Sequence, residues 1–126
     1  MSTEFYEIHG VRVYEYPEDG PLLSNERHAT DAIAAAREHQ ASLLVLPTER
    51  LSNDFFQLKT GVAGTVIQKF VTYGVRLAIV GDISKHLEAS NSLRDFVYEA
   101  NRGRHLWFLA NHSELEKKLA SSREAR

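Results

Sequence analysis

Three short apolar runs, separated by amphipathic helical stretches, constrain the fold of this chain more than any other feature. The runs are residues 42–46 (SLLVL), 75–80 (VRLAIV) and 105–110 (HLWFLA). Their apolar residues are nearly continuous rather than alternating, as in strands that are covered on both faces of a parallel sheet. Because parallel strands are joined by right-handed helical crossovers, the pattern predicts an α/β fold with a mostly parallel sheet.

Four helices are expected between and after these runs. Apolar residues recur at helical spacing from residue 24 or 25 to about 40, from 60 to 73, across 93–100 and from 113 onwards. Two pairs have the spacing of capping boxes, Ser92 with Asp95 and Ser113 with Glu116. The sequence therefore predicts that the last two helices begin at these serines.

An N-terminal hairpin completes the predicted sheet. Residues 5–8 and 11–16 are rich in β-forming residues, and His9-Gly10 between them suits a tight turn. A hairpin adds an antiparallel strand, so the sheet is expected to be mixed. The 126 residues are enough for one hydrophobic core, and we interpret residues 1–126 as a single domain.

Composition excludes several classes of protein. The 43% hydrophobic and 25% charged content is that of an ordinary soluble globular protein. A net charge of −2 argues against non-specific nucleic-acid binding, which needs a concentrated basic face. Without cysteine, neither a disulfide nor a thiolate metal site can form. No apolar run approaches the roughly 20 residues that span a bilayer, and the acidic N-terminus is not a signal peptide. We expect a cytoplasmic protein without nucleic-acid or membrane partners.

Two stretches of the sequence carry a family resemblance. FFQLKTGVAGTVIQKFVTYGVRLAIVGD, followed by SLRDFVYEANRG, resembles a bacterial family of STAS-like domains of unknown function, over residues 53–108. The order of elements is similar to that of STAS-type anti-sigma-factor antagonists. The resemblance implies a STAS-like fold and a non-enzymatic, regulatory role in protein–protein interaction. It also implies a protein partner such as a regulatory kinase.

The resemblance further implies a position for a phosphorylation switch. In the antagonists a partner kinase phosphorylates a serine in an Asp-Ser-Ser-Gly motif that opens a helix. The matching residues are Leu58, Lys59, Thr60 and Gly61, so Thr60 occupies the acceptor position. Leu58 and Lys59 stand where that motif has its aspartate and first serine.

The same helix start can also be interpreted from its residues alone. The free N–H groups of a helix N-terminus can hold an anion or a phosphorylated side chain, and Lys59 would add a positive charge. The structural interpretation, which we favour, is that Thr60 caps the helix while Gly61 and Gly64 let it approach the sheet closely.

Phe55 and Phe56 are adjacent aromatic residues in a predicted loop before this helix. Two large neighbouring side chains do not easily enter one core. We expect one ring to cover the sheet edge and the other to form part of a patch for a partner or a second copy.

A second candidate site is a polar rim where the predicted strands end. It comprises Thr48, Glu49, Asp82, Asn111 and His112. If the strands are adjacent and parallel, these side chains meet at one edge and could bind a small ligand or an anion. The structural interpretation, which we favour, is that strand ends are polar because loops begin there, with Asp82 capping its own turn.

The sequence contains no recognisable catalytic or metal-binding pattern. Its histidines lack the i, i+4 spacing of a zinc site, and no G-x-S-x-G nucleophile motif occurs. We therefore expect no metal, no cofactor and no enzymatic activity. The leading hypothesis is an interaction module that uses Lys59 to Gly64 and the two phenylalanines. The alternative is a small-ligand or anion binder, or a minor enzyme, that uses the rim with Asp82 and His112. A homodimer through the hairpin or a sheet edge is compatible with both.

Overall fold

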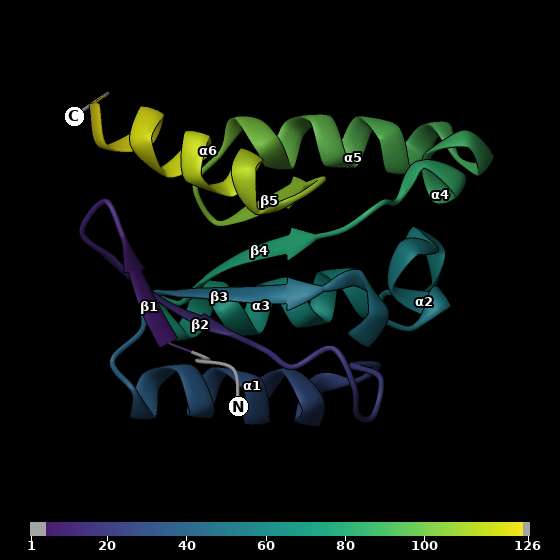
Figure 1. Cartoon of the computed structure of the whole chain (residues 1–126). Helices are drawn as coiled ribbons and strands as arrows, with labels where there is room; N and C mark the ends of the chain where they lie inside the picture. The colour runs from purple at the N-terminus through teal and green to yellow at the C-terminus, as the bar shows by residue number, and fades with distance from the viewer. Residues whose placement is uncertain (1–4, 125–126) are drawn as a thin grey trace.

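The computed structural model describes residues 5–124, which form one small α/β domain built on a five-stranded sheet (Figure 1). The strands lie in chain order: β1 (Phe5–Ile8), β2 (Val11–Glu15), β3 (Leu43–Pro47), β4 (Arg76–Val80) and β5 (Leu106–Leu109). β1 pairs with β2 antiparallel, and the other neighbours are parallel. The predicted mixed, mostly parallel sheet with an N-terminal hairpin is confirmed.

The described residues form six α-helices, where the sequence predicts about four. They are α1 (Glu26–Glu38), α2 (Asn53–Phe56), α3 (Val62–Tyr73), α4 (Ser84–Ala89), α5 (Asn91–Arg102) and α6 (His112–Glu124), with short 3₁₀ turns η1 (Thr48–Arg50) and η2 (Leu58–Thr60). The two unexpected helices are α2 and α4, of four and six residues. Such short helices span less than two turns, so no apolar periodicity distinguishes them from loops.

The cap of helix α5 lies two residues before the predicted one. Ser90 is the capping residue, and its side chain accepts a hydrogen bond from the backbone N–H of Leu93 at 3.1 Å. Ser90 has extended backbone angles, whereas Ser92 already lies inside the helix. The predicted pair of Ser92 and Asp95 is therefore wrong as a cap, because the chain supplies a serine at an earlier, extended position.

The helices cover the two faces of the sheet unequally. Since the strands follow chain order, each right-handed crossover moves in the same direction and places α1, α3 and α5 on one face. Helix α6 follows the last strand and covers the opposite face (Figure 1). Its Leu115 and Leu119 belong there to one buried cluster with Val45, Ala78 and Trp107. This arrangement leaves no reversal of strand order, which is the usual position of a ligand cleft in open α/β sheets.

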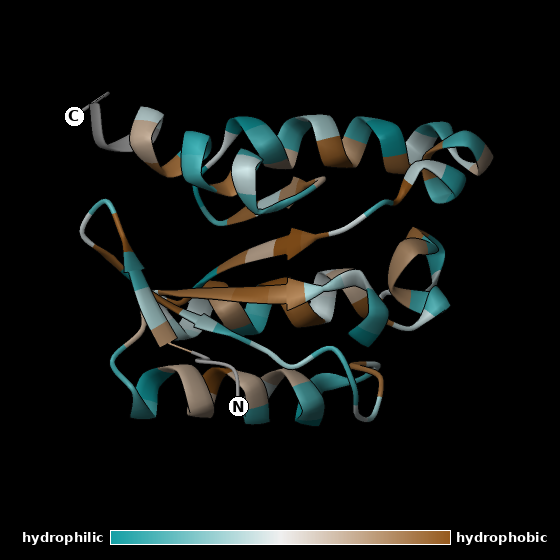
Figure 2. Ribbon diagram, viewed as in Figure 1, coloured by the Kyte–Doolittle hydropathy of each residue, from teal (hydrophilic) through white to brown (hydrophobic). Residues whose placement is uncertain are grey.

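The central strands are buried on both faces, which explains the continuous apolar runs of the sequence. All five residues of β3 are buried, as are the last four of β4. Figure 2 shows these strands as an apolar centre of the domain. On the three-helix side, Leu44, Leu46 and Leu77 join one core. The opposite core is smaller and contains the only tryptophan.

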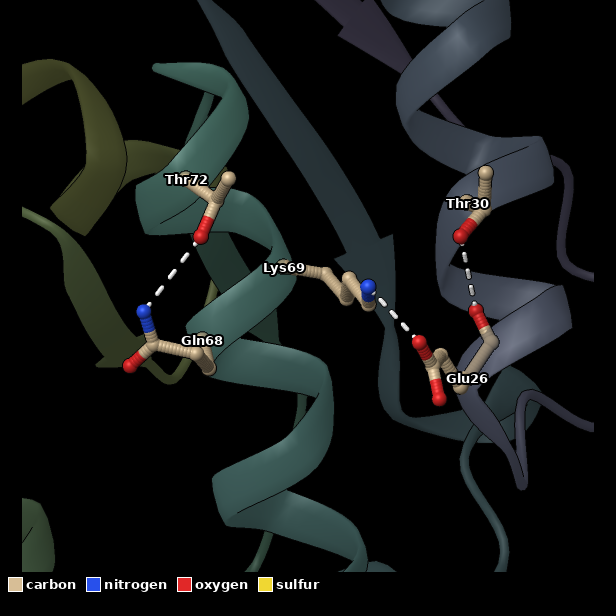
Figure 3. Close-up of polar contacts among 5 residues, drawn as sticks. All are labelled: Glu26, Thr30, Gln68, Lys69 and Thr72. Carbon is tan, nitrogen blue, oxygen red and sulfur yellow. Dashed lines mark hydrogen bonds and ion pairs between the residues drawn. The ribbon is translucent and has the colours of Figure 1, made fainter.

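Polar contacts on the outer surface connect α1 to α3. Lys69 Nζ lies 2.6 Å from the Glu26 carboxylate (Figure 3). This hydrogen bond and the negative charge of Glu26 raise the pKa of Lys69. Within the helices, Thr30 Oγ1 donates to the Glu26 carbonyl and Gln68 Nε2 donates to Thr72 Oγ1. These exposed contacts add little stability compared with the core beneath them.

In the described part of the chain, no helix combines the length and the apolar character that crossing a membrane requires.

Candidate functional site

A groove lies at the C-terminal ends of β3 and β4, between the α2–η2 segment and α4. We call it the strand-end groove, and it consists of two adjoining hollows that are open to solvent. The acidic hollow, of about 380 Å³, is lined by Thr48, Glu49, Leu51, Asn53, Phe56, Gly81, Asp82, Ile83 and His86. The basic hollow, of about 510 Å³, is lined by Phe56, Gln57, Leu58, Lys59, His86, Ala89, Ser90 and Ser92.

Phe56 and His86 form the ridge that the two hollows share. Their rings stack with centroids 4.1 Å apart and planes inclined by 11°. Phe56 comes from α2 and His86 from α4, so the ridge joins the two short helices that the sequence did not reveal. The stack places a flat ring surface, formed chiefly by His86, between the two polar ends of the groove.

The expectation that either Phe55 or Phe56 forms part of an exposed patch is wrong. The side chains are only 1% and 5% exposed, and both belong to the larger core. The single turn of α2 turns both rings inward, where they meet edge to face with centroids 5.4 Å apart. Only Phe56 reaches the groove, through the ring that stacks on His86.

Gly81 brings the ends of β3 and β4 together in the acidic hollow. Its φ of 146° is disfavoured for L side chains, and a Cβ at this position would overlap the Thr48 side chain. The absence of a side chain thus allows Thr48, which follows β3, to pack against the end of β4. This contact forms one wall of the acidic hollow.

Asp82 forms another wall and has a structural partner. Its Oδ1 accepts hydrogen bonds from the Ser84 hydroxyl at 2.6 Å and from the Ser84 backbone N–H at 2.9 Å. These bonds lower the pKa of Asp82, so the side chain remains ionised. The carboxylate closes the turn that leads into α4, as the structural interpretation of the sequence predicts.

Thr60 closes the η2 turn and does not cap α3. Its hydroxyl donates towards the carbonyls of Asp54 at 2.7 Å and Gln57 at 2.8 Å. Its oxygen also accepts a longer hydrogen bond, of 3.3 Å, from the Val62 N–H. The capping residue of α3 is Gly61, one position later than predicted.

The two glycines of this helix start do not bring α3 close to the sheet. A Cβ on Gly61 or Gly64 would meet no atom within 4 Å, so the expected packing role is wrong. Gly61 is required instead for its left-handed backbone, with φ of 80°. Of the exposed residues from Lys59 to Gly64, Lys59 alone lines a hollow of the groove.

The predicted rim is divided between two places. Thr48, Glu49 and Asp82 meet in the acidic hollow, whereas Asn111 and His112 lie outside it. Asn111 Oδ1 accepts from the Glu114 N–H at 3.0 Å and so caps α6, in place of the predicted Ser113. Because α6 lies on the other face of the sheet, its first residues are carried away from the groove.

His112 belongs to a separate cluster beside the hairpin. Its Nε2 lies 2.7 Å from Glu15 Oε2, and the Tyr6 hydroxyl donates to Glu15 Oε1 at 2.7 Å. Burial, followed by the hydrogen bond and charge of Glu15, raises the pKa of Tyr6. His9 and Glu116 approach within 3.8 Å nearby. Sequence reasoning missed this cluster because its residues come from opposite ends of the chain.

Arg50 is a buried charged residue that the sequence did not single out. Its guanidinium donates to the carbonyls of Pro17, Asp19 and Pro21 at 2.8 to 3.0 Å and lies 4.4 Å from the centre of the Tyr16 ring. These contacts fix the loop after β2. We assign Arg50 a structural role, because its donors are directed at backbone of its own chain.

Between residues 5 and 124, no group of three or more histidine, aspartate or glutamate side chains is arranged to hold a metal ion.

Comparison with known protein families assigns the chain to one family. The model of a family described as a domain of unknown function (DUF4180) matches residues 8–119. The chain belongs to this family. No curated protein and no solved structure matches the chain. The matched residues of this DUF4180 domain contain the whole strand-end groove.

Proposed function

We propose that this protein is a non-enzymatic regulatory module that binds a segment of a partner protein in the strand-end groove. The observation that carries the proposal is the pattern of charge across the groove. Lys59 lies on one side of the Phe56–His86 ridge, and Glu49 and Asp82 lie on the other. A peptide segment with an acidic and a basic residue on either side of an apolar one matches this pattern.

The polar side chains of the basic hollow are available for binding. Among the described residues, the side chains of Gln57, Lys59, His86 and Ser92 form no hydrogen bond or ion pair with one another or with the rest of the fold. A partner can engage them without breaking existing contacts. The Phe56 ring is almost fully buried, so the partly exposed His86 ring is the part of the ridge that a partner can contact.

The family resemblance of the sequence also supports a regulatory role. The observed order, a hairpin followed by alternating helices and strands, is the one that the resemblance to STAS-type antagonists implies. A relationship to those proteins remains part of the proposal.

A phosphorylation switch at Thr60 would act on this groove. A phosphate would displace the hydrogen that Thr60 directs towards Asp54 and Gln57, and it would add a charge of about −1.5 to −2 beside Lys59. We infer that such a modification would loosen the η2 turn and neutralise the basic hollow. It would therefore weaken the binding of an acidic segment.

The acidic hollow supports a second candidate function, the binding of a small cationic ligand. Its volume of about 380 Å³ suits a small molecule, and the Glu49 carboxylate has no hydrogen-bond or ion-pair partner among the described residues. A cation there would interact with Glu49 and Asp82 without contact to Lys59. The two candidates thus differ in which side of the ridge they need.

Binding by groove variants tests the proposal. Proteins captured by crosslinking in the native cells would be identified with the wild type and then purified for titration calorimetry. Lys59→Glu and Glu49→Lys each place a like charge against the expected partner segment, and we expect each to weaken binding by roughly tenfold or more. Thr60→Glu should act in the same direction as Lys59→Glu. Lys117→Glu and Glu99→Lys change exposed charges outside the groove and serve as matched controls.

The outcomes separate the candidates. If a captured partner binds Lys59→Glu and Glu49→Lys as tightly as it binds the controls, the groove is not its binding surface and the proposal is wrong. If small cations raise the melting temperature of the wild type and of Lys59→Glu but not of Glu49→Gln, the small-ligand function is favoured instead.

A further inference from the structure

The outer edge of β5 is covered by a side chain of its own domain. Asn101 Nδ2 donates to the Phe108 carbonyl at 3.2 Å, and Asn101 Oδ1 accepts from the Phe108 N–H at 2.7 Å. The amide thus takes both outward-facing backbone groups of Phe108, as a neighbouring strand would. Lys118 Nζ donates to the Asn101 carbonyl at 2.5 Å and ties this cover to α6. Another strand therefore cannot pair at this point.

The outer edge of β1 has no such cover among the described residues. Arg12 and Tyr14 direct their backbone groups towards β3, as shown by the 3.1 Å hydrogen bond from the Ser42 N–H to the Arg12 carbonyl. In an antiparallel pair the residues opposite them, Glu7 and Phe5, therefore direct their N–H and C=O groups away from the sheet. These four groups form a ready template for one more strand.

We propose that a second copy of this chain pairs with this edge, β1 against β1 in antiparallel orientation. Strand addition at an edge is a known mode of association, and a two-fold axis makes the same surface complementary to itself. With Tyr6 opposite Tyr6 of the second copy, Phe5 of each copy exchanges its backbone hydrogen bonds with Glu7 of the other. This register uses all four outward groups of Phe5 and Glu7.

Charge selects this register over the adjacent one. A shift that placed Glu7 opposite Glu7 of the second copy would set two carboxylates directly across from each other, which is destabilising. In the Tyr6-centred register each Glu7 faces a phenylalanine. Glu7 is also the cross-strand neighbour of Arg12 within its own hairpin, so its negative charge has a nearby cation. The side chains that meet at the two-fold axis are aromatic.

A single introduced cysteine tests the register directly, because the chain contains none. In the proposed pairing the two Tyr6 residues form a non-hydrogen-bonded pair with Cα atoms about 4.5 Å apart, within disulfide range. Mild oxidation of Tyr6→Cys should give a covalent dimer in most of the protein. His105→Cys, beside the covered edge at β5, is the matched control and should give at least tenfold less dimer.

A second variant tests the edge without a crosslink. Glu7→Pro removes an outward N–H and leaves the hydrogen bonds to β2 in place, as proline at an edge strand allows. Two backbone hydrogen bonds per dimer are lost, so the dissociation constant measured by analytical ultracentrifugation should rise roughly 10- to 100-fold. Circular dichroism establishes that the variant is folded. If Glu7→Pro does not fold, the proposal is tested by the crosslinking of Tyr6→Cys against His105→Cys and by the sedimentation of the wild type.

Two results would overturn the proposal. One is a wild-type protein that sediments as a monomer at every concentration up to about 1 mM, the weak end of specific association. The other is a dimer that persists unchanged in folded Glu7→Pro, or equal crosslinking of Tyr6→Cys and His105→Cys. In those cases β1 either remains unpaired or is reserved for a different protein.

Discussion

Tyr6 links the pH dependence of stability to a single hydrogen bond. We expect Tyr6→Phe to lower the free energy of unfolding by about 1 kcal/mol at pH 8, because it removes a donor from the half-buried Glu15 carboxylate. The pKa of Tyr6 is raised in the folded state, so the neutral phenol stabilises the fold below pH 10, the ordinary value. This contribution is lost as the pH rises above that value, because the unfolded chain then releases the proton and the folded chain retains it.

Urea unfolding of the wild type and Tyr6→Phe at pH 8 and at about pH 11 measures this effect. The difference in unfolding free energy between the two proteins should shrink at the higher pH. An equal difference at both pH values would show that the phenol ionises alike in the folded and unfolded chain. Tyr98→Phe is the matched control, since it removes the same hydroxyl from a tyrosine that is 63% exposed.

Single residues of the groove could be predicted from sequence only where they sat beside a recognisable element. Glu49 and Asp82 follow apolar strands, so their positions at the strand ends could be expected, and Lys59 could be placed at the start of a periodic helix. His86 had no such marker, because it lies in a six-residue helix within a polar stretch. Its pairing with Phe56 depends on tertiary packing, which no local spacing encodes.

At the scale of elements, the two glycines at the start of α3 should respond in opposite ways to alanine. Gly61 has a left-handed backbone, so Gly61→Ala should destabilise the protein by roughly 1–2 kcal/mol. Gly64 lies within the helix with open space around it, so Gly64→Ala should stabilise by roughly 0.5–1 kcal/mol. Denaturant midpoints of the two variants measure both effects. A loss of stability in Gly64→Ala would mean that the glycine serves a packing contact after all.

The elements themselves were predictable where the sequence repeats a pattern. The buried strands and the helices α1, α3 and α5 follow from continuous apolar runs and helical spacing. The cap of α5 was not predictable, because Ser90 and Ser92 are chemically equivalent and only the backbone decides between them. The same limit explains why Asn111 rather than Ser113 begins α6.

At the scale of the whole molecule, the two faces of the sheet are covered by different numbers of helices. Three helices protect one face, and within the described residues α6 alone protects the other. The mostly parallel sheet could be predicted from the alternation of helices and strands, but the strand order and the placement of α6 could not. No crossover follows β5, so the handedness rule does not restrict the final helix. That placement is what separates His112 from the rest of the predicted rim.

The shared strands should nevertheless make the molecule unfold as one unit. Leu43, Val45 and Ala78 belong to the α6 core, while Leu44 and Leu77, their immediate neighbours, belong to the three-helix core. Detaching α6 exposes residues whose strands also hold the other core, so neither layer is stable alone. We therefore expect a two-state transition, as in most small single domains.

Trp107 provides the test, because it is the only tryptophan and is 2% exposed in the α6 core. Its fluorescence reports on that core, whereas far-ultraviolet circular dichroism reports on all the helices. Both signals should give the same urea midpoint. Leu119→Ala, which removes a buried contact of α6, should lower both midpoints equally, by the equivalent of about 2–5 kcal/mol. A fluorescence change that precedes the loss of helical signal would instead show that α6 detaches first, because its face of the sheet depends on a single helix.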